Sequence, residues 1–207
     1  MSGYLDVVEA GVRFKNQRAA LFRARGKRKT EKELSDAVDR FVLDGIDRGI
    51  QIYEQEKARY EKEFRRLSRR HSMIRNLATL PGIGLIGSVK VAAIVVDPRR
   101  FRNKGHFLSY SGLVHLDKMS GGRSYGHREP RSNRVLKSVF KTAALAAIVA
   151  ANEQNPLRQY YEYLLKEKRY AEHNARHAVA RRIAIFAWGV LKTKKKFNWR
   201  SKTKLNT

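Results

Sequence analysis

Residues 31–76 carry the feature that most restricts the fold, a row of apolar side chains that recur at mostly three- and four-residue steps. The row consists of Leu34, Val38, Phe41, Ile46, Ile50, Tyr53, Tyr60, Phe64 and Leu67. Charged residues of both signs fill the positions between them, as in YEQEKARYEKEFRRLSRR. This spacing predicts one long helix with a narrow apolar seam, as in a coiled coil or an antiparallel helical hairpin. Gly45 and Gly49 weaken the middle of that helix.

A shorter amphipathic helix is expected over residues 4–25, and the GKRK segment that follows is the expected hinge. Residues 1–76 are therefore interpreted as a helical, coiled-coil-like arm. Such an arm either binds a partner or a second copy of the chain, or packs on its own domain. The sequence leaves both readings open.

The charge is high and unevenly spread. The chain has 45 Lys and Arg against 19 Asp and Glu, a formal net charge of +26. Residues 1–64 carry 14 basic and 12 acidic side chains, whereas residues 65–207 carry 31 and 7. A cationic body of this kind attracts polyanions, which indicates a nucleic-acid-binding protein; a merely basic, ribosome-like protein is the alternative. With no Cys, no apolar run long enough to span a membrane and no signal peptide, we expect an intracellular protein, in the cytoplasm or at the nucleoid.

The segment LATLPGIGLIGSVKVAAIVV, which begins at Leu77, predicts a helix-hairpin-helix element. Gly82 and Gly84 in its turn would let the backbone approach a phosphate, and the next helix would present free N–H groups. An ordinary turn is the other reading.

The remaining segments predict a mainly α fold, with short extended pieces only near residues 112–125. A helix is expected to run through Tyr110 and stop at Gly112. An Ala-rich buried helix follows Ser132 or Asn133 as its N-cap, and two more helices start near Pro156 and residue 174. We divide the chain into the arm (1–76), a compact nucleic-acid-binding domain (77–193) and a frayed basic tail (194–207).

The cationic body offers few groups for acid–base or metal chemistry. It has seven acids, and none forms a close cluster outside a helical face. His173 and His177 are four residues apart on an expected helix, without an acidic partner motif, and are interpreted as surface residues. We therefore expect no metal site within this chain.

The most chemically suggestive stretch is DKMSGGRSYGHREPRSNRVLK, residues 117–137, which reads as a loop before a helix. Gly121 and Gly122 would let the backbone turn tightly beside Ser120. The cations that follow, which suit phosphate binding, are Arg123, Arg128, Arg131, Arg134 and Lys137. Ser120 is either a nucleophile that attacks a phosphodiester or a turn residue in a loop that holds a nucleic-acid backbone.

Taken in order, these motifs resemble the C-terminal transposase domain of the IS110 family of insertion sequences. The matching segments are LATLPGIG, VDPRRFRNKGHFLSYSGLV, MSGGRSYGHREPRSNRVLK and TAALAA, and the arm and the last helices are also similar to that family. The resemblance implies an RNA-guided DNA recombinase whose serine in the S-G-G loop becomes covalently joined to DNA, a role that falls on Ser120. It also implies a structured guide RNA as partner and a homo-oligomer, which we expect to form through the arm.

The sequence departs from that family at two points. The family begins with a RuvC-like domain whose four acids bind Mg²⁺, and this chain starts where that domain is expected to end. The usual basic K-R-G segment is replaced by residues 130–133, PRSN. We therefore expect Mg²⁺ only through a RuvC-like partner. Three readings stay open: a transposase subunit or fragment that uses Ser120, a non-catalytic nucleic-acid-binding protein derived from that domain, and a helix-hairpin-helix protein that binds structured RNA.

Overall fold

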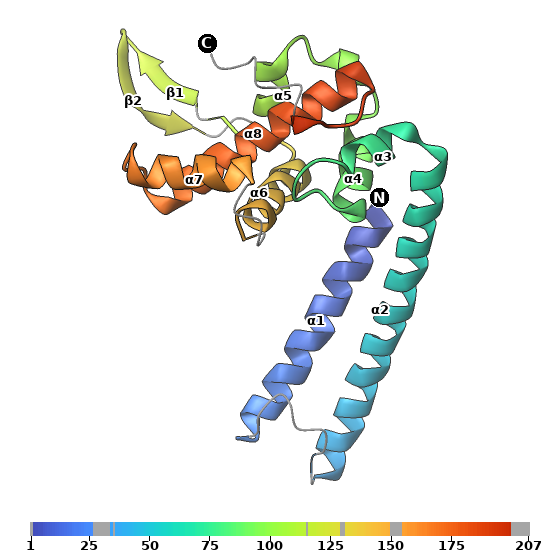
Figure 1. Cartoon of the computed structure of the whole chain (residues 1–207). Coiled ribbons are helices and arrows are strands. Elements are labelled where there is room, and N and C mark those ends of the chain that lie inside the picture. The colour runs from blue at the N-terminus through green and yellow to red at the C-terminus, as the bar shows by residue number, and fades with distance from the viewer. Residues whose placement is uncertain are drawn as a thin grey trace. The chain divides into compact units, whose positions relative to one another are not determined.

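The computed structural model describes residues 2–26, 34, 36–114, 116–128, 131–149 and 155–199, and the side chains of residues 116–119, 124, 127 and 128 lie outside that description. The described part is mainly helical, as expected (Figure 1). Its elements are α1 (Ser2–Ala24), α2 (Ala37–Arg70), α3 (Ser72–Leu77), α4 (Leu85–Val95), the 3₁₀ turn η1 (Pro98–Arg100), α5 (Lys104–Tyr110), β1 (Leu116–Ser120), β2 (Arg123–Arg128), α6 (Arg134–Val149), α7 (Pro156–Lys166) and α8 (Glu172–Thr193). They fall into two compact units, residues 1–66 and 67–207. The division into an arm, a domain and a tail, with boundaries at residues 76 and 193, was made on functional grounds and stays a prediction.

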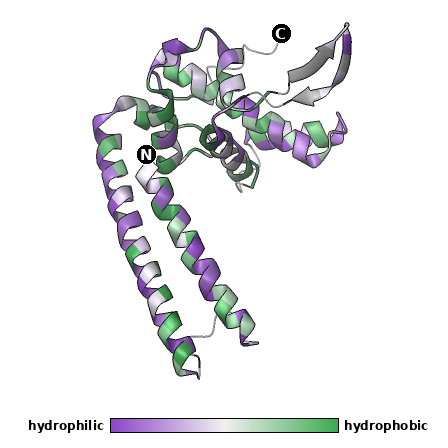
Figure 2. Ribbon diagram, turned by 180° about the vertical axis from the view of Figure 1, so that it is seen from behind, coloured by the Kyte–Doolittle hydropathy of each residue, from purple (hydrophilic) through white to green (hydrophobic). Residues whose placement is uncertain are grey.

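In the first unit, α1 and α2 pair in antiparallel fashion. The Tyr4 ring meets Phe64 edge-on, with centroids 5.1 Å apart. Gly49 lies so close to Phe14 that an added Cβ would come within 2.6 Å of the ring. Later residues of α1 therefore contact earlier residues of α2, as in an antiparallel pair. Figure 2 shows polar and apolar residues mixed along both helices.

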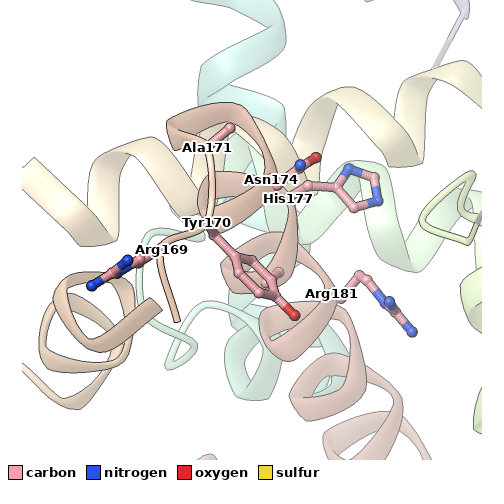
Figure 3. Close-up of a pocket in the computed structure, with 7 residues that line it drawn as sticks. Arg169, Tyr170, Ala171, Asn174, His177 and Arg181 are labelled. Atoms are coloured by element: carbon pink, nitrogen blue, oxygen red, sulfur yellow. The ribbon is translucent and has the colours of Figure 1, made fainter. Parts of the chain in front are cut away.

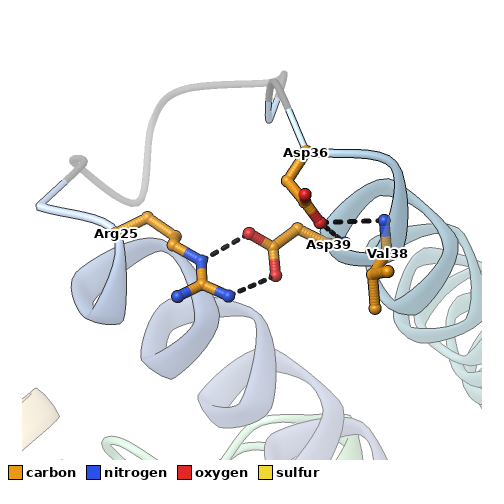
Figure 4. Close-up of polar contacts among 4 residues, drawn as sticks. All are labelled: Arg25, Asp36, Val38 and Asp39. Carbon is orange, nitrogen blue, oxygen red and sulfur yellow. Dashed lines mark hydrogen bonds and ion pairs between the residues drawn. The ribbon is translucent and has the colours of Figure 1, made fainter.

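An ion pair links the end of α1 to the start of α2, and a side chain caps the start of α2 (Figure 4). The Arg25 guanidinium donates two hydrogen bonds to the Asp39 carboxylate, one of them 2.8 Å long from Nη2 to Oδ1. These hydrogen bonds lower the pKa of Asp39 below its ordinary value. One oxygen of Asp36 accepts from the backbone N–H groups of Val38 and Asp39, and so caps the start of α2.

The prediction of a single helix over residues 31–76 is wrong at both ends. α2 begins after the Asp36 cap, and it stops at Arg70 because His71 takes an extended conformation, with φ −112° and ψ 109°. The His71 carbonyl then accepts the first hydrogen bonds of α3. Arg75 reaches back to donate to the carbonyls of Ser68 and Arg69, which satisfies acceptors at the end of α2.

The core of the second unit is built around α8. Nine of its residues are buried: Ala175, Val179, Ala180, Ile183, Ala184, Phe186, Ala187, Val190 and Leu191. The alanines among them allow close packing, and α8 contacts α3, α5, α6, α7 and η1. α6 buries Ala143, Ala144 and Ala147 in the same core, as expected for an Ala-rich buried helix. Among the described helices, none is both long and apolar enough to cross a bilayer.

The expectation of a frayed tail is wrong for residues 194–199, and residues 200–207 lie outside the described part. Asn76 Nδ2 donates to the Lys194 carbonyl at 2.6 Å, and the Phe197 N–H donates to Thr79 Oγ1 at 2.9 Å. Phe197 and Trp199 also stack edge-on, with centroids 4.8 Å apart. These contacts hold the end of the described chain against the segment after α3.

Candidate nucleic-acid interface

Ser120 lies at the tip of a two-stranded antiparallel hairpin rather than in an irregular loop (Figure 1). It pairs with Arg123, so the turn consists of Gly121 and Gly122 alone. Both glycines have positive φ, 54° and 75°. Two-residue hairpin turns with positive φ at both positions are type I′, and their twist matches that of the strands. The positive φ angles of this turn therefore favour glycine, and a phosphate contact by Gly121 or Gly122 stays a prediction.

The pairing of Ser120 with Arg123 decides which cation lies nearest the hydroxyl. Directly opposed residues of an antiparallel pair project from the same face, with Cβ atoms about 5 Å apart. Both residues are exposed. The exposed guanidinium of Arg123 can therefore reach a phosphate held at the Ser120 hydroxyl.

The base of the hairpin is fixed by contacts between residues 110–112 and 132–137. The Asn133 N–H donates to the Tyr110 carbonyl at 2.8 Å. Gly112 has φ 65°, as expected for a helix stop, and an added Cβ would lie 2.6 Å from Ser132 Oγ and 3.1 Å from Lys137 Cδ. Asn133 caps α6 by accepting from the Leu136 N–H at 3.0 Å, which settles the choice between the two expected caps.

This geometry separates the predicted phosphate-binding cations into two groups. Arg123 lies at the tip, whereas exposed Arg131 and Arg134 and half-buried Lys137 lie beyond the base. The strands rise about 3.4 Å per residue, so the tip is roughly 14 Å from the first pair at the base. Among these described cations, Arg123 is the one that the strand pairing places beside Ser120. Arg128 belongs to β2, but its side chain lies outside the described part.

The two glycines of the PGIG turn have different environments. Gly82 has φ 73°, and an added Cβ would lie 2.0 Å from the Ala143 carbonyl oxygen of α6. Gly84 is the N-cap of α4, with φ −81° and no described atom within 4 Å of an added Cβ. Gly82 is therefore required for packing, whereas the exposed backbone at Gly84 remains accessible to a ligand.

Sequence reasoning missed a cationic face where α6 meets α8. Lys137 and Lys141 of α6 line a pocket of about 420 Å³ together with His173, Arg176 and His177 of α8. His173 is exposed and His177 is half-buried. Both helices carry these residues at four-residue spacing, which places them on one face. That spacing was visible in the sequence, but the pairing of the two helices was not.

Metal-ligating side chains do not gather in the described part of the chain. No group of three or more His, Asp or Glu there could hold a metal ion. The described residues therefore do not fit a Mg²⁺ site.

Comparison with known proteins identifies a transposase-like segment. Residues 74–162 match the family model described as Transposase IS116/IS110/IS902 family. The segment includes α4, the hairpin and α6. The resemblance expected from the sequence is thus confirmed for these residues.

Two curated relatives are also similar to this chain. An uncharacterized 44.8 kDa protein of insertion element IS116 from Streptomyces clavuligerus is 30% identical over 139 residues, 66% of this chain and 34% of that protein. An uncharacterized 43.6 kDa protein of insertion element IS110 from Streptomyces coelicolor is 30% identical over 112 residues, 54% of this chain and 27% of that protein. The chain thus spans about a third or less of the length of these relatives.

Proposed function

We propose that this chain acts in DNA transposition, as a subunit or segment of a transposase in which Ser120 attacks the DNA backbone. The position of Ser120 carries the proposal: an exposed hydroxyl at the tip of a narrow hairpin, opposite Arg123. The transposase family match over residues 74–162, which include the hairpin, supports it. The surplus of 24 positive charges in residues 65–207, from 31 basic and 7 acidic side chains, supports a polyanionic substrate.

The reaction we propose is a transesterification. Ser120 Oγ attacks the phosphorus of a phosphodiester and forms a new O–P bond, while the bond from phosphorus to one sugar oxygen breaks. That oxygen leaves as a hydroxyl and takes up the proton that Ser120 loses. The Arg123 guanidinium stabilises the charge that develops on the phosphoryl oxygens. Attack by a sugar hydroxyl of another strand reverses the step, rejoins DNA and frees Ser120.

The base of the hairpin positions the DNA. Arg131, Arg134 and Lys137 contact the backbone beyond the base of the hairpin, which lies about 14 Å along the strands from its tip. We place the backbone at Gly84 against a further phosphate. Such contacts fix the register of a duplex without reading its sequence.

The remaining components of the reaction come from partners. A RuvC-like domain or protein supplies the carboxylates and Mg²⁺, and a structured guide RNA selects the DNA. The arm joins copies of the chain into an oligomer. We place this activity in the cytoplasm, at the nucleoid.

The test is the covalent adduct between protein and DNA, measured with a RuvC-like partner and end-labelled DNA. We expect Ser120→Ala to abolish the adduct while DNA affinity stays within about twofold, because a neutral hydroxyl adds little to phosphate binding. Ser138→Ala, at an exposed serine of α6, is the matched control and should keep the adduct. Adduct formation by Ser120→Ala would refute the nucleophile assignment.

A non-catalytic nucleic-acid-binding protein, for DNA or structured RNA, is the second candidate. It is favoured by the lack of any metal-binding cluster among the described residues. Both candidates predict that the affinity for duplex DNA falls steeply with salt, since phosphate contacts release counterions. They differ in the adduct: none should form with wild-type protein under any partner combination if the second candidate is right.

A further inference from the structure

Two adjoining pockets lie on either side of the first turns of α8. The first, between α6 and α8, has a volume of about 420 Å³. The second, of about 440 Å³, lies between α8 and the segment that enters it, residues 169–171 (Figure 3). Asn174 and His177 line both pockets, so the two hollows adjoin at the first turns of α8.

The charge of this surface has a single sign. Cationic side chains come from three segments: Lys141 on α6, Arg169 before α8, and Arg181 on α8. The described residues that line the two pockets include no Asp or Glu. Glu172 is the nearest acid along α8, and it is held by Arg176 and by the Tyr161 hydroxyl. The surface therefore suits an anion with several negative groups.

Two features of the second pocket are unusual for a surface turn. Arg169 has φ 51°, a left-handed conformation that costs a non-glycine residue about 1 kcal/mol or more. The turn is held by the Tyr170 N–H, which donates to the Leu164 carbonyl at 2.9 Å. Tyr170 itself is 48% exposed although its ring lines the pocket. In Figure 3 the ring projects between Arg169 and Arg181.

We propose that these pockets bind a single-stranded stretch of nucleic acid. An unpaired base stacks on Tyr170, and the flanking phosphates contact Arg169, Arg181 and Lys141. Stacking on an exposed aromatic side chain requires a base that is free of its partner, and cationic grooves with such side chains bind single strands. The base pairs of a duplex are stacked inside it and cannot enter a concave pocket.

This proposal rests on the proposed function only in taking nucleic acid as the ligand. It does not depend on Ser120 chemistry, and the two can fail separately. Ser120→Ala should leave single-strand affinity unchanged, whereas changes at Tyr170 and Arg169 should leave duplex affinity unchanged.

The test is fluorescence anisotropy of the full chain with a short single-stranded DNA, the same sequence as RNA, and the corresponding duplex. We expect Tyr170→Leu to weaken single-strand binding about 5- to 100-fold, the effect of losing one stacked base. Tyr163→Leu is the matched control, because Tyr163 is 44% exposed on α7 and lines neither pocket. It should change single-strand affinity less than about twofold, since it stacks no base.

Arg169→Gly provides a second variant that keeps the fold, because glycine adopts positive φ without strain. It should lower single-strand affinity and reduce the slope of log K against log salt by about 0.7, the value for one phosphate contact. If the variants lose more affinity for single-stranded DNA than for RNA, the pockets bind DNA. The opposite result means that they bind RNA. An equal loss with single strand and duplex, or no loss with either Tyr170→Leu or Arg169→Gly, would overturn the proposal.

Discussion

Replacing Gly82 by alanine should destabilise the second unit strongly. The backbone at Gly82 has φ 73°, and an alanine Cβ built there would lie 2.0 Å from the Ala143 carbonyl oxygen. The left-handed conformation costs alanine about 1–2 kcal/mol. Relieving the overlap requires α6 or the turn to move, which adds about 1–3 kcal/mol. We therefore expect the free energy of unfolding to fall by roughly 2–5 kcal/mol.

Gly84→Ala is the matched control, two residues away in the same turn. Alanine is a poorer N-cap than glycine, but it also reduces the entropy of the unfolded chain, so the net change should stay within about 1 kcal/mol. The assay is urea denaturation followed by far-UV circular dichroism. Equal transition midpoints for the two variants would refute the steric reasoning. If Gly84→Ala also weakens duplex binding at unchanged stability, the backbone at Gly84 contacts phosphate.

Three further predictions concern the arm and the hairpin. In α2, Gly49→Ala should lower the thermal midpoint, because its Cβ would overlap a packed ring, whereas Gly45→Ala, which meets no described atom, should stabilise by up to about 1 kcal/mol. Arg25 lowers the pKa of Asp39, so the stability from this pair is present above about pH 4 and is lost as pH falls through the lowered pKa. In thermal melts at several pH values, Asp39→Asn should reduce the fall in melting temperature on acidification. An unchanged fall would exclude Asp39 as its source. Gly121→Asn should keep both hairpin and adduct, since Asn tolerates positive φ at the first position of a type I′ turn, and loss of the adduct alone would mean that a bare backbone is needed there.

The helices were predictable because their signals are local. Apolar spacing identified α8. Asn155 caps α7 and Pro156 is its first residue, both of which are typical of a helix start. Gly112, with positive φ, follows the end of α5. The break at His71 was not predictable from such signals, because it involves neither Gly nor Pro.

Long-range packing explains what the sequence could not provide. Residues 194–199 looked like a frayed tail, yet their backbone is held by Asn76 and Thr79, each 118 positions away from its partner. The pocket surface likewise combines α6 with the entry to α8. In both cases the sequence around each residue was typical of a protein surface, and only the fold brought the residues together.

The hairpin also changes what the cluster of arginines after Ser120 means. In sequence, all of them follow the serine closely and would be expected to share its phosphate. The strand pair instead leaves Arg123 at the tip, whereas Arg131 and Arg134 follow the other end of the hairpin, about 14 Å along the strands from the tip. A single cation near the nucleophile is too little to offset the charge of a phosphoryl transition state in water. The reaction proposed at Ser120 therefore requires further positive charge at the tip, and the proposed metal-bearing partner would have to supply it there rather than at the base.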